Sequence, residues 1–105
     1  MRFQPIFHPL IEADVREGMR RYDRESPGLG ARFRRTFYAV VDELLVFPEK
    51  HPVKQGANIR TRLLRPFPYL IFCTVENDGV YVLSVQYAGR SPAFLKETLQ
   101  QRRSS

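Results

Sequence analysis

The sequence has very few of the residues that cross-link a small protein or bind metal ions. It contains one cysteine, Cys73, which excludes a disulfide within the chain. This cysteine and the two histidines, His8 and His51, lie too far apart along the chain to form a zinc-binding motif. We therefore expect no metal ion and no cofactor.

A long apolar segment is also missing. No stretch of about 18 apolar residues occurs, and Pro5, His8 and Pro9 interrupt the N-terminal region in which a signal peptide would need its apolar run. We expect a cytoplasmic protein that has no contact with membranes. A Gly-rich phosphate loop and internal repeats are absent as well, so nucleotide hydrolysis is not indicated.

Length and charge are more informative. A chain of 105 residues buries roughly two-thirds of the surface that its unfolded form exposes, so residues 1–105 are expected to form one domain with one compact fold. The sequence has 17 Lys and Arg against 11 Asp and Glu, a net charge of +6. This charge favours an acidic partner, either nucleic acid or an acidic protein, although Arg-rich solvated helix surfaces give the same signal.

A first amphipathic helix is predicted from Pro9 to about Glu25. Its apolar residues recur at spacings of four, four and three, and its charged residues fall elsewhere on the helical wheel. The apolar residues are Ile11, Val15, Met19 and Tyr22. Before this helix, residues 1–8 have the pattern of a short strand, which Pro5 restricts to an edge or an irregular position.

A second helix is predicted after Ser26, which offers an N-cap, and Pro27, which fits the first helical position. A continuous apolar stripe then extends until Pro48 ends the helix. The stripe consists of Leu29, Phe33, Phe37, Val40, Val41, Leu44 and Leu45. The short connection favours an antiparallel helical hairpin, whose two stripes need a common surface to bury against.

The second half of the chain is predicted to form the sheet that supplies this surface. Strands are expected over residues 59–65, 69–75 and 80–87, and Asn77-Asp78-Gly79 is a hairpin turn signal. A short helix from Pro92 is expected to fray from Gln100 onward. The expected fold class is α+β, a small antiparallel sheet packed against an N-terminal helical hairpin in the order β-α-α-β-β-β-α.

Basic residues are concentrated in the middle of the chain. No acidic residue occurs between Glu49 and Glu76, and five basic residues follow one another there: Lys50, Lys54, Arg60, Arg62 and Arg65. If Arg60 and Arg62 project from an exposed face of the sheet, these side chains converge on a surface that attracts phosphates or carboxylate-rich peptides. Arg90, just beyond the last strand, either joins this surface or has a structural role, in which it pairs with a carboxylate or caps a carbonyl.

Candidates for acid-base or nucleophilic chemistry are few. His51 is the only histidine near the basic stretch. Tyr87 either has a functional role, in which it stacks on a base or donates a proton, or packs as a half-buried strand residue. Cys73 lies in an apolar strand and is expected to be a buried, inert thiol. Glu12 and Asp14 do not share a helix face, so they are not a catalytic pair.

Several local strings, in this order and spacing, carry a resemblance to a known family. They are Ala13-Asp14-Val15, Ser26-Pro27, Leu44 to Pro48, Ile59-Arg60, Phe67 to Phe72, and Val82 to Pro92. Over nearly its whole length the chain resembles the RelE/ParE superfamily of toxins from bacterial type II toxin-antitoxin systems, in particular the ParE-like, plasmid-stabilisation branch. The resemblance implies a growth-inhibiting toxin that a cognate antitoxin neutralises in a hetero-oligomer.

Two kinds of target are implied by the resemblance. RelE-like members cleave mRNA on the ribosome, and ParE-like members poison DNA gyrase without being nucleases. Arg60 and Arg90 match family arginines, whereas Tyr87 stands where a His is common and the tail after Arg90 lacks Tyr and His. We therefore expect a ParE-like toxin that binds a target such as gyrase.

Two alternatives remain open at this point. One is an endoribonuclease that uses Arg60, Arg90 and Tyr87 in catalysis. The other is an inactive relative that retains only antitoxin binding. The residues expected to bind the target or nucleic acid are Lys50, Lys54, Arg60, Arg62, Arg65 and Arg90.

Overall fold

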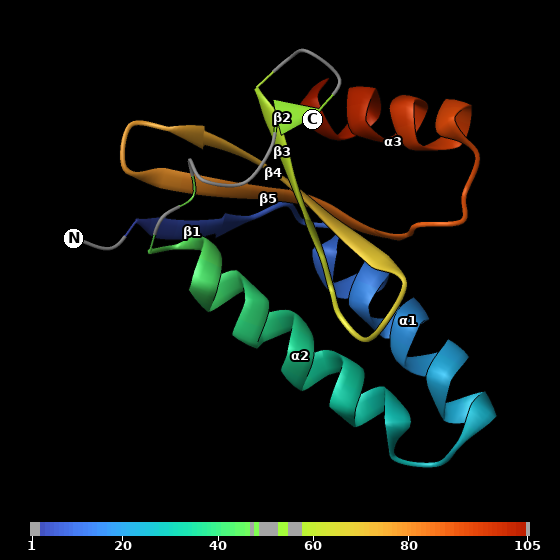
Figure 1. Ribbon diagram of the computed structural model, residues 1–105. Coiled ribbons are helices and arrows are strands. Elements are labelled where there is room, and N and C mark those ends of the chain that lie inside the picture. The colour runs from blue at the N-terminus through green and yellow to red at the C-terminus, as the bar shows by residue number, and fades with distance from the viewer. Residues whose placement is uncertain (1–2, 47, 49–52, 55–57, 105) are drawn as a thin grey trace.

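The computed structural model describes residues 3–46, 48, 53–54 and 58–104. The elements in chain order are β1 (Gln4–Phe7), α1 (Ile11–Glu25), α2 (Leu29–Leu44), β2 (Val53–Lys54), β3 (Ile59–Leu63), β4 (Tyr69–Glu76), β5 (Gly79–Tyr87) and α3 (Pro92–Ser104). The predicted α+β fold and its element order are confirmed, with the two-residue strand β2 added before β3. Figure 1 shows the α1–α2 hairpin on one side of the sheet and α3 on the other.

The strands form one sheet in the order β1-β5-β4-β3-β2. Three neighbouring pairs are antiparallel, but β1 runs parallel to β5. The prediction of a purely antiparallel sheet is therefore wrong at this edge, because a long crossover that includes the helical hairpin connects β1 to β5. Pro5 lies in this edge strand, as its missing N–H requires.

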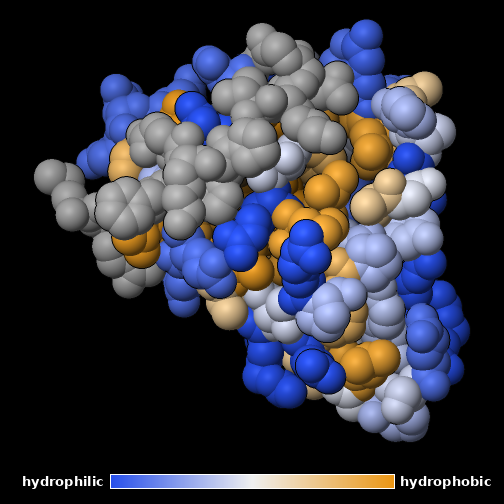
Figure 2. All heavy atoms as spheres, in the orientation of Figure 1, coloured by the Kyte–Doolittle hydropathy of each residue, from blue (hydrophilic) through white to orange (hydrophobic). Residues whose placement is uncertain are grey.

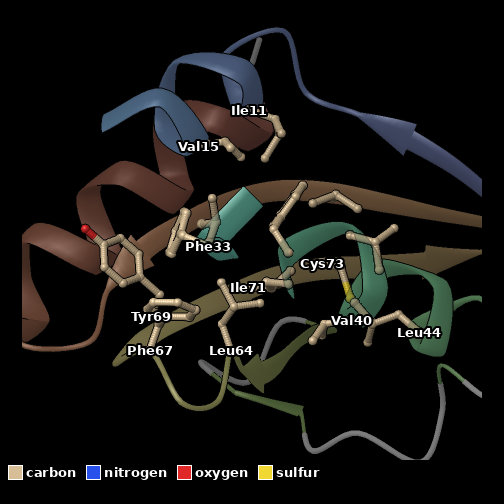
Figure 3. Packing of buried hydrophobic residues seen from close by; sticks show 14 of the residues in the cluster. Ile11, Val15, Phe33, Val40, Leu44, Leu64, Phe67, Tyr69, Ile71 and Cys73 are labelled. Atoms are coloured by element: carbon tan, nitrogen blue, oxygen red, sulfur yellow. The ribbon is translucent and has the colours of Figure 1, made fainter. Parts of the chain in front are cut away.

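The main hydrophobic core lies between the sheet and the hairpin. Phe33, Phe37 and Leu44 of α2 are completely buried there against Ile71 and Val82 of the sheet. Figure 3 shows side chains of both helices and of the strands pointing into this layer. The stripe predicted for the second helix is thus confirmed as the inner face of α2.

Two glycines allow the two helices to cross closely. A Cβ on Gly18 would overlap the ring of Phe33, and a Cβ on Gly30 would come within 2.5 Å of the backbone oxygen of Met19. Close crossing of this kind aligns the apolar faces of both helices on one surface of the sheet. The hairpin therefore presents one continuous apolar layer.

The predicted start of the second helix is wrong in detail. Ser26 ends α1, and Gly28 is the N-cap residue of α2, with a left-handed φ of 91° that glycine adopts without strain. The side chain that caps α2 comes from α1, because Asp23 Oδ1 accepts the N–H of Gly30 at 2.8 Å. Ser26 therefore supplies no cap to α2.

A smaller core lies between α3 and the opposite face of the sheet. Its buried residues are Ile59, Phe72, Leu83 and Leu99. Contrary to the expected fraying, α3 continues to Ser104, because Arg102 in its last turn is held by Asp14 of α1. None of the helices in the described part of the chain is long and apolar enough to cross a membrane.

Candidate functional site

The structure places the predicted basic residues on more than one surface. Lys50 and His51 lie outside the described residues, and of Lys54 only its position in β2 is described. Arg60 and Arg62 are in β3, Arg65 follows it in an exposed turn, and Arg90 follows β5. The four arginines therefore belong to different parts of the fold.

Arg60 and Arg62 lie on the hairpin side of the sheet. Arg60 is opposite Cys73 and Arg62 is opposite Ile71, and both partners belong to the core beneath the hairpin. Paired residues on neighbouring strands share a face, so the two arginines lie on the hairpin face of β3 and do not project from the α3 side. Arg62 donates to Glu43 Oε1 of α2 at 2.8 Å.

Cys73 is the buried thiol that the sequence predicts. Its residue is 1% exposed, and burial raises the pKa of the thiol from 9.0 to about 11, against a smaller opposing effect of the positive charge of Arg60. A thiol with this pKa is almost entirely protonated at neutral pH, so it is a poor nucleophile.

Arg90 is engaged by two other elements. Its Nη2 donates to Glu17 Oε1 of α1 at 2.9 Å, and its guanidinium lies 4.7 Å from the ring centre of Phe94 in α3. Pairing with a carboxylate was one of the roles considered for Arg90 from the sequence, and the structure contains this pair.

A tyrosine-arginine cluster surrounds this position and consists of Glu17, Arg21, Tyr69, Tyr87 and Arg90. The rings of Tyr69 and Tyr87 are 5.9 Å apart, and the guanidinium of Arg21 lies 3.9 Å from the ring centre of Tyr87. Burial raises the pKa of Tyr69, and the charge of Arg21 acts in the opposite direction. Arg21 was not predicted as a site residue, because only the fold brings α1 to the ends of β4 and β5.

The register separates this cluster from Arg60. Arg60 is level with Cys73 and Val82, whereas Tyr69 and Tyr87 are level with each other. The two rows are four residues apart along β4, which is about 13 Å at the usual rise per strand residue. Arg90 lies beyond Tyr87, so the backbone of the sheet does not bring Arg60 and Arg90 together.

A third group of polar residues, centred on Asp14 and Arg102, connects α1 on the hairpin side of the sheet to α3 on the other side. Arg102 forms a two-pronged ion pair with Asp14 at 2.9 Å for each contact, and it also donates to the carbonyl oxygen of Leu83 at 2.9 Å. Asp14 Oδ2 accepts the N–H of Val85 at 3.1 Å. The side chains of Asp14 and Arg102 are only 9% and 10% exposed.

This Asp14–Arg102 clamp closes the edge of β5 where β1 ends. The sequence gives no local signal for it, since the two residues are 88 positions apart. No group of three His, Cys, Asp or Glu side chains suited to a metal ion occurs within the described residues. The clamp connects α3 to α1 and β5 through its own hydrogen bonds and is a structural ion pair.

Comparison with known proteins identifies the family. Residues 6–92 match the family described as ParE toxin of type II toxin-antitoxin system, parDE. The chain belongs to this ParE toxin family. The predicted RelE/ParE resemblance is thereby confirmed. No curated protein matched the sequence.

Two solved structures have a similar fold. One is a chain described as the chromosomal ParDE TA system from P. aeruginosa, with a TM-score of 0.74, 13% identity, and coverage of 82% of this chain and 96% of that chain. The other is a double mutant of the E. coli toxin RelE in the free state, with a TM-score of 0.71, 19% identity, and coverage of 96% and 98%. At identities of 13% and 19%, these two structures show that this chain shares their fold.

Proposed function

We propose that this ParE family member is the growth-inhibiting toxin of a type II pair and that it acts by binding a protein target, with DNA gyrase as the first candidate. We further propose that a cognate antitoxin neutralises it in a hetero-oligomer. The family match supports the toxin role, and the similar P. aeruginosa structure is described as a toxin-antitoxin system.

The observation that carries the choice of a protein target is the separation of Arg60 from Arg90. Cleavage of RNA through the ribose 2′-OH needs cations and an acid-base group around a single phosphate. Here Arg60 lies four residues along the sheet from the row of Tyr69 and Tyr87, Arg90 lies beyond that row, and Arg90 is paired with Glu17. Tyr87, the remaining candidate, is partly buried beneath the guanidinium of Arg21.

The surface between β3 and α3 has the mixed character of a protein-binding surface. Leu63 and Leu70 face each other across β3 and β4 and are only partly buried. Figure 2 shows apolar atoms in the middle of this view of the molecule, bordered by strongly hydrophilic side chains. An apolar centre with a charged rim is typical of protein interfaces. We assign target binding to this region and to the basic residues Lys50, Lys54, Arg60, Arg62, Arg65 and Arg90, of which Arg60 and Arg62 lie on the hairpin side of the sheet.

The test is induction of this chain alone in a bacterial host. Transcript 5′ ends and gyrase-dependent DNA breaks are measured in the same culture. We expect growth arrest with DNA breaks and intact transcripts. Codon-phased mRNA cuts that disappear in the Arg60→Ala/Arg90→Ala double variant would instead establish a ribonuclease, and normal growth would indicate an inactive relative.

The double variant needs a folded reference. Arg24→Ala removes an exposed arginine from the last turn of α1, remote from both positions in the chain, and serves as the control for removal of a surface arginine. Circular dichroism of each purified variant establishes that it retains the wild-type fold, which matters because Arg90 also pairs with Glu17. A change that occurs in the double variant but not in Arg24→Ala is then assigned to the two arginines.

A further inference from the structure

The seam between α1 and α2 forms an exposed groove on the surface of the hairpin. A hollow of about 190 Å³ lies between the two helices, and a wider one of about 510 Å³ lies beside it along α2. Arg34 and Tyr38 line both hollows, so we treat them as one hairpin groove. Its other lining residues are Glu12, Val15, Arg16 and Met19 of α1 and Arg35, Ala39 and Asp42 of α2.

The smaller hollow suits one side chain of a partner better than a free small molecule. Its volume is below the lower limit of about 300 Å³ typical of small-molecule sites. The buried Val15 and the partly buried Met19 supply apolar atoms to its lining. An aliphatic side chain can therefore be buried there.

Tyr38 is an exposed aromatic residue that its neighbours hold in place. Its ring lies edge-on at 4.9 Å from the ring of Phe37 and 6.3 Å from the ring of Phe7, and the guanidinium of Arg34 lies 5.0 Å from its centre. Even so, Tyr38 and Phe7 are 38% and 39% exposed. A side chain that is already held loses little conformational entropy on binding, and Tyr and Arg often dominate the energy of protein interfaces.

The groove contains arginines that its own carboxylates do not compensate. Glu12 lies 3.6 Å from Arg16. Among the residues that the structure describes, Arg34 contacts only the ring of Tyr38, and Arg35 forms no ion pair. Both arginines are exposed. The groove therefore offers two cations to carboxylates of a partner.

This combination favours an acidic amphipathic helix over the other possible occupants. A nucleic acid would bring its phosphates against the carboxylates of Glu12 and Asp42. A second copy of this chain seated groove to groove would place arginines opposite arginines, which costs free energy. An amphipathic helix offers apolar side chains at spacings of three and four, with acidic residues beside them, and this arrangement fits a groove with an apolar hollow and arginines on its rim.

We propose that the hairpin groove binds an acidic amphipathic helix of the antitoxin. An apolar side chain of that helix enters the smaller hollow beside Tyr38, and its carboxylates pair with Arg34 and Arg35. The net charge of +6 attracts such a helix. This inference rests on the proposed function, under which an antitoxin exists. None of the basic residues assigned to target binding lines the groove, so antitoxin contact there can be removed without removing those residues.

The first test is an NMR titration of the full chain with a synthetic helical peptide that has leucines on one face and glutamates on the other. We expect shift changes at the amides of Met19, Arg34 and Tyr38. Arg34→Glu/Arg35→Glu should bind this peptide at least about tenfold more weakly than the wild type, and the same peptide with glutamines should bind the wild type at least about tenfold more weakly.

The matched control is Arg24→Glu/Arg32→Glu. It changes the net charge by the same amount at two exposed arginines of the same helices, which do not line the groove. Circular dichroism establishes that both double variants are folded. Equal affinities of the two double variants, equal affinities of the two peptides, or shift changes confined to other surfaces would overturn the assignment of the groove.

The second test identifies the partner in cells that express the chain with and without the antitoxin from its own operon. Arg34→Glu/Arg35→Glu should be as toxic alone as the wild type, but protection should require at least about tenfold more antitoxin. Full protection at the wild-type antitoxin level, or a loss of toxicity in this folded variant, would overturn the assignment of the antitoxin as occupant. A wild-type chain that is not toxic would refute the proposed function, and the titration would still decide the groove.

Discussion

The two faces of the sheet are covered by helices that are held in different ways. On the hairpin face, α1 and α2 bury a continuous layer that includes Phe33, Phe37 and Tyr22. On the other face, the buried core is formed by Ile59, Phe72, Leu83 and Leu99, and the Asp14–Arg102 clamp is added to it. Helix α3 is therefore held in part by a buried ion pair, whereas the hairpin is held by buried apolar surface.

The two faces should therefore differ in whether they can unfold locally. Apolar burial contributes through many contacts spread over a whole helix, so the hairpin should open only when the domain unfolds. A buried ion pair depends on the geometry of two side chains, and the loss of one partner leaves the other uncompensated. The α3 face is thus the one on which a local change can occur without global unfolding.

The largest effect is expected on the hairpin face. Phe33→Ala removes a completely buried ring that packs against Tyr22 and Phe67, and it should lower the free energy of unfolding by about 3–5 kcal/mol. Phe94→Ala is the control, since Phe94 is 42% exposed and its loss should cost less than about 1 kcal/mol. Urea denaturation measures both, and equal losses would contradict the assignment of the main core to the hairpin face.

A second prediction tests the clamp. Arg102→Met leaves the carboxylate of Asp14 buried without its partner and should destabilise the docking of α3 by about 3 kcal/mol. Hydrogen exchange should then become faster in residues 92–104, while α2 keeps its protection.

The matched double variant separates the loss of charge pairing from the loss of packing. In Asp14→Leu/Arg102→Met neither charge remains in the buried position, so most of the lost protection of α3 should return. If the double variant exchanges as fast as Arg102→Met, the ion pair does not anchor α3 in the way described.

The two faces also differ in how much of them the sequence could predict. The hairpin follows from apolar spacing, because the residues of the stripe from Leu29 to Leu45 all pack against one surface, Leu29 being only partly buried. The strands and the turn at Asn77 follow from local signals as well. Fold class and family were therefore predictable, and the parallel placement of β1 was missed because it depends on a crossover.

The candidate site was less predictable, because its contacts are made between distant segments. The pairing of Arg90 with Glu17 and of Arg102 with Asp14 joins residues 73 and 88 positions apart. Spacing along the chain contains no information on such pairs. Alternation in β3 correctly placed Arg60 and Arg62 on one side, but it could not tell which side of the sheet the hairpin covers.

A third prediction tests how closely α1 and α2 cross on the hairpin face. Gly30→Ala brings a Cβ against the backbone oxygen of Met19 and the carboxylate of Asp23, and it should lower the free energy of unfolding by about 1–3 kcal/mol. Gly28→Ala is a useful comparison, because it has open space but a φ of 91°. Thermal denaturation compares them, and a stabilised Gly30→Ala would contradict the close crossing.

The smallest effect concerns pH and the first turn of α1. Burial, with a further contribution from the charge of Arg102, lowers the pKa of His8 below 6.5, against an opposing effect of Asp14. Because the unfolded chain then binds the proton more readily, this residue contributes stability that is complete above pH 6.5 and is lost as the pH falls through the lower folded pKa.

His8→Asn distinguishes this charge effect from the loss of a hydrogen bond. An asparagine oxygen can still accept the N–H of Leu10 two residues on, but it does not titrate. Urea denaturation between pH 5 and pH 8 should therefore show a smaller decline of stability toward acid pH in His8→Asn than in the wild type. An unchanged decline would mean that His8 is already solvated enough in the folded state to bind its proton freely, and that Arg102 does not influence it.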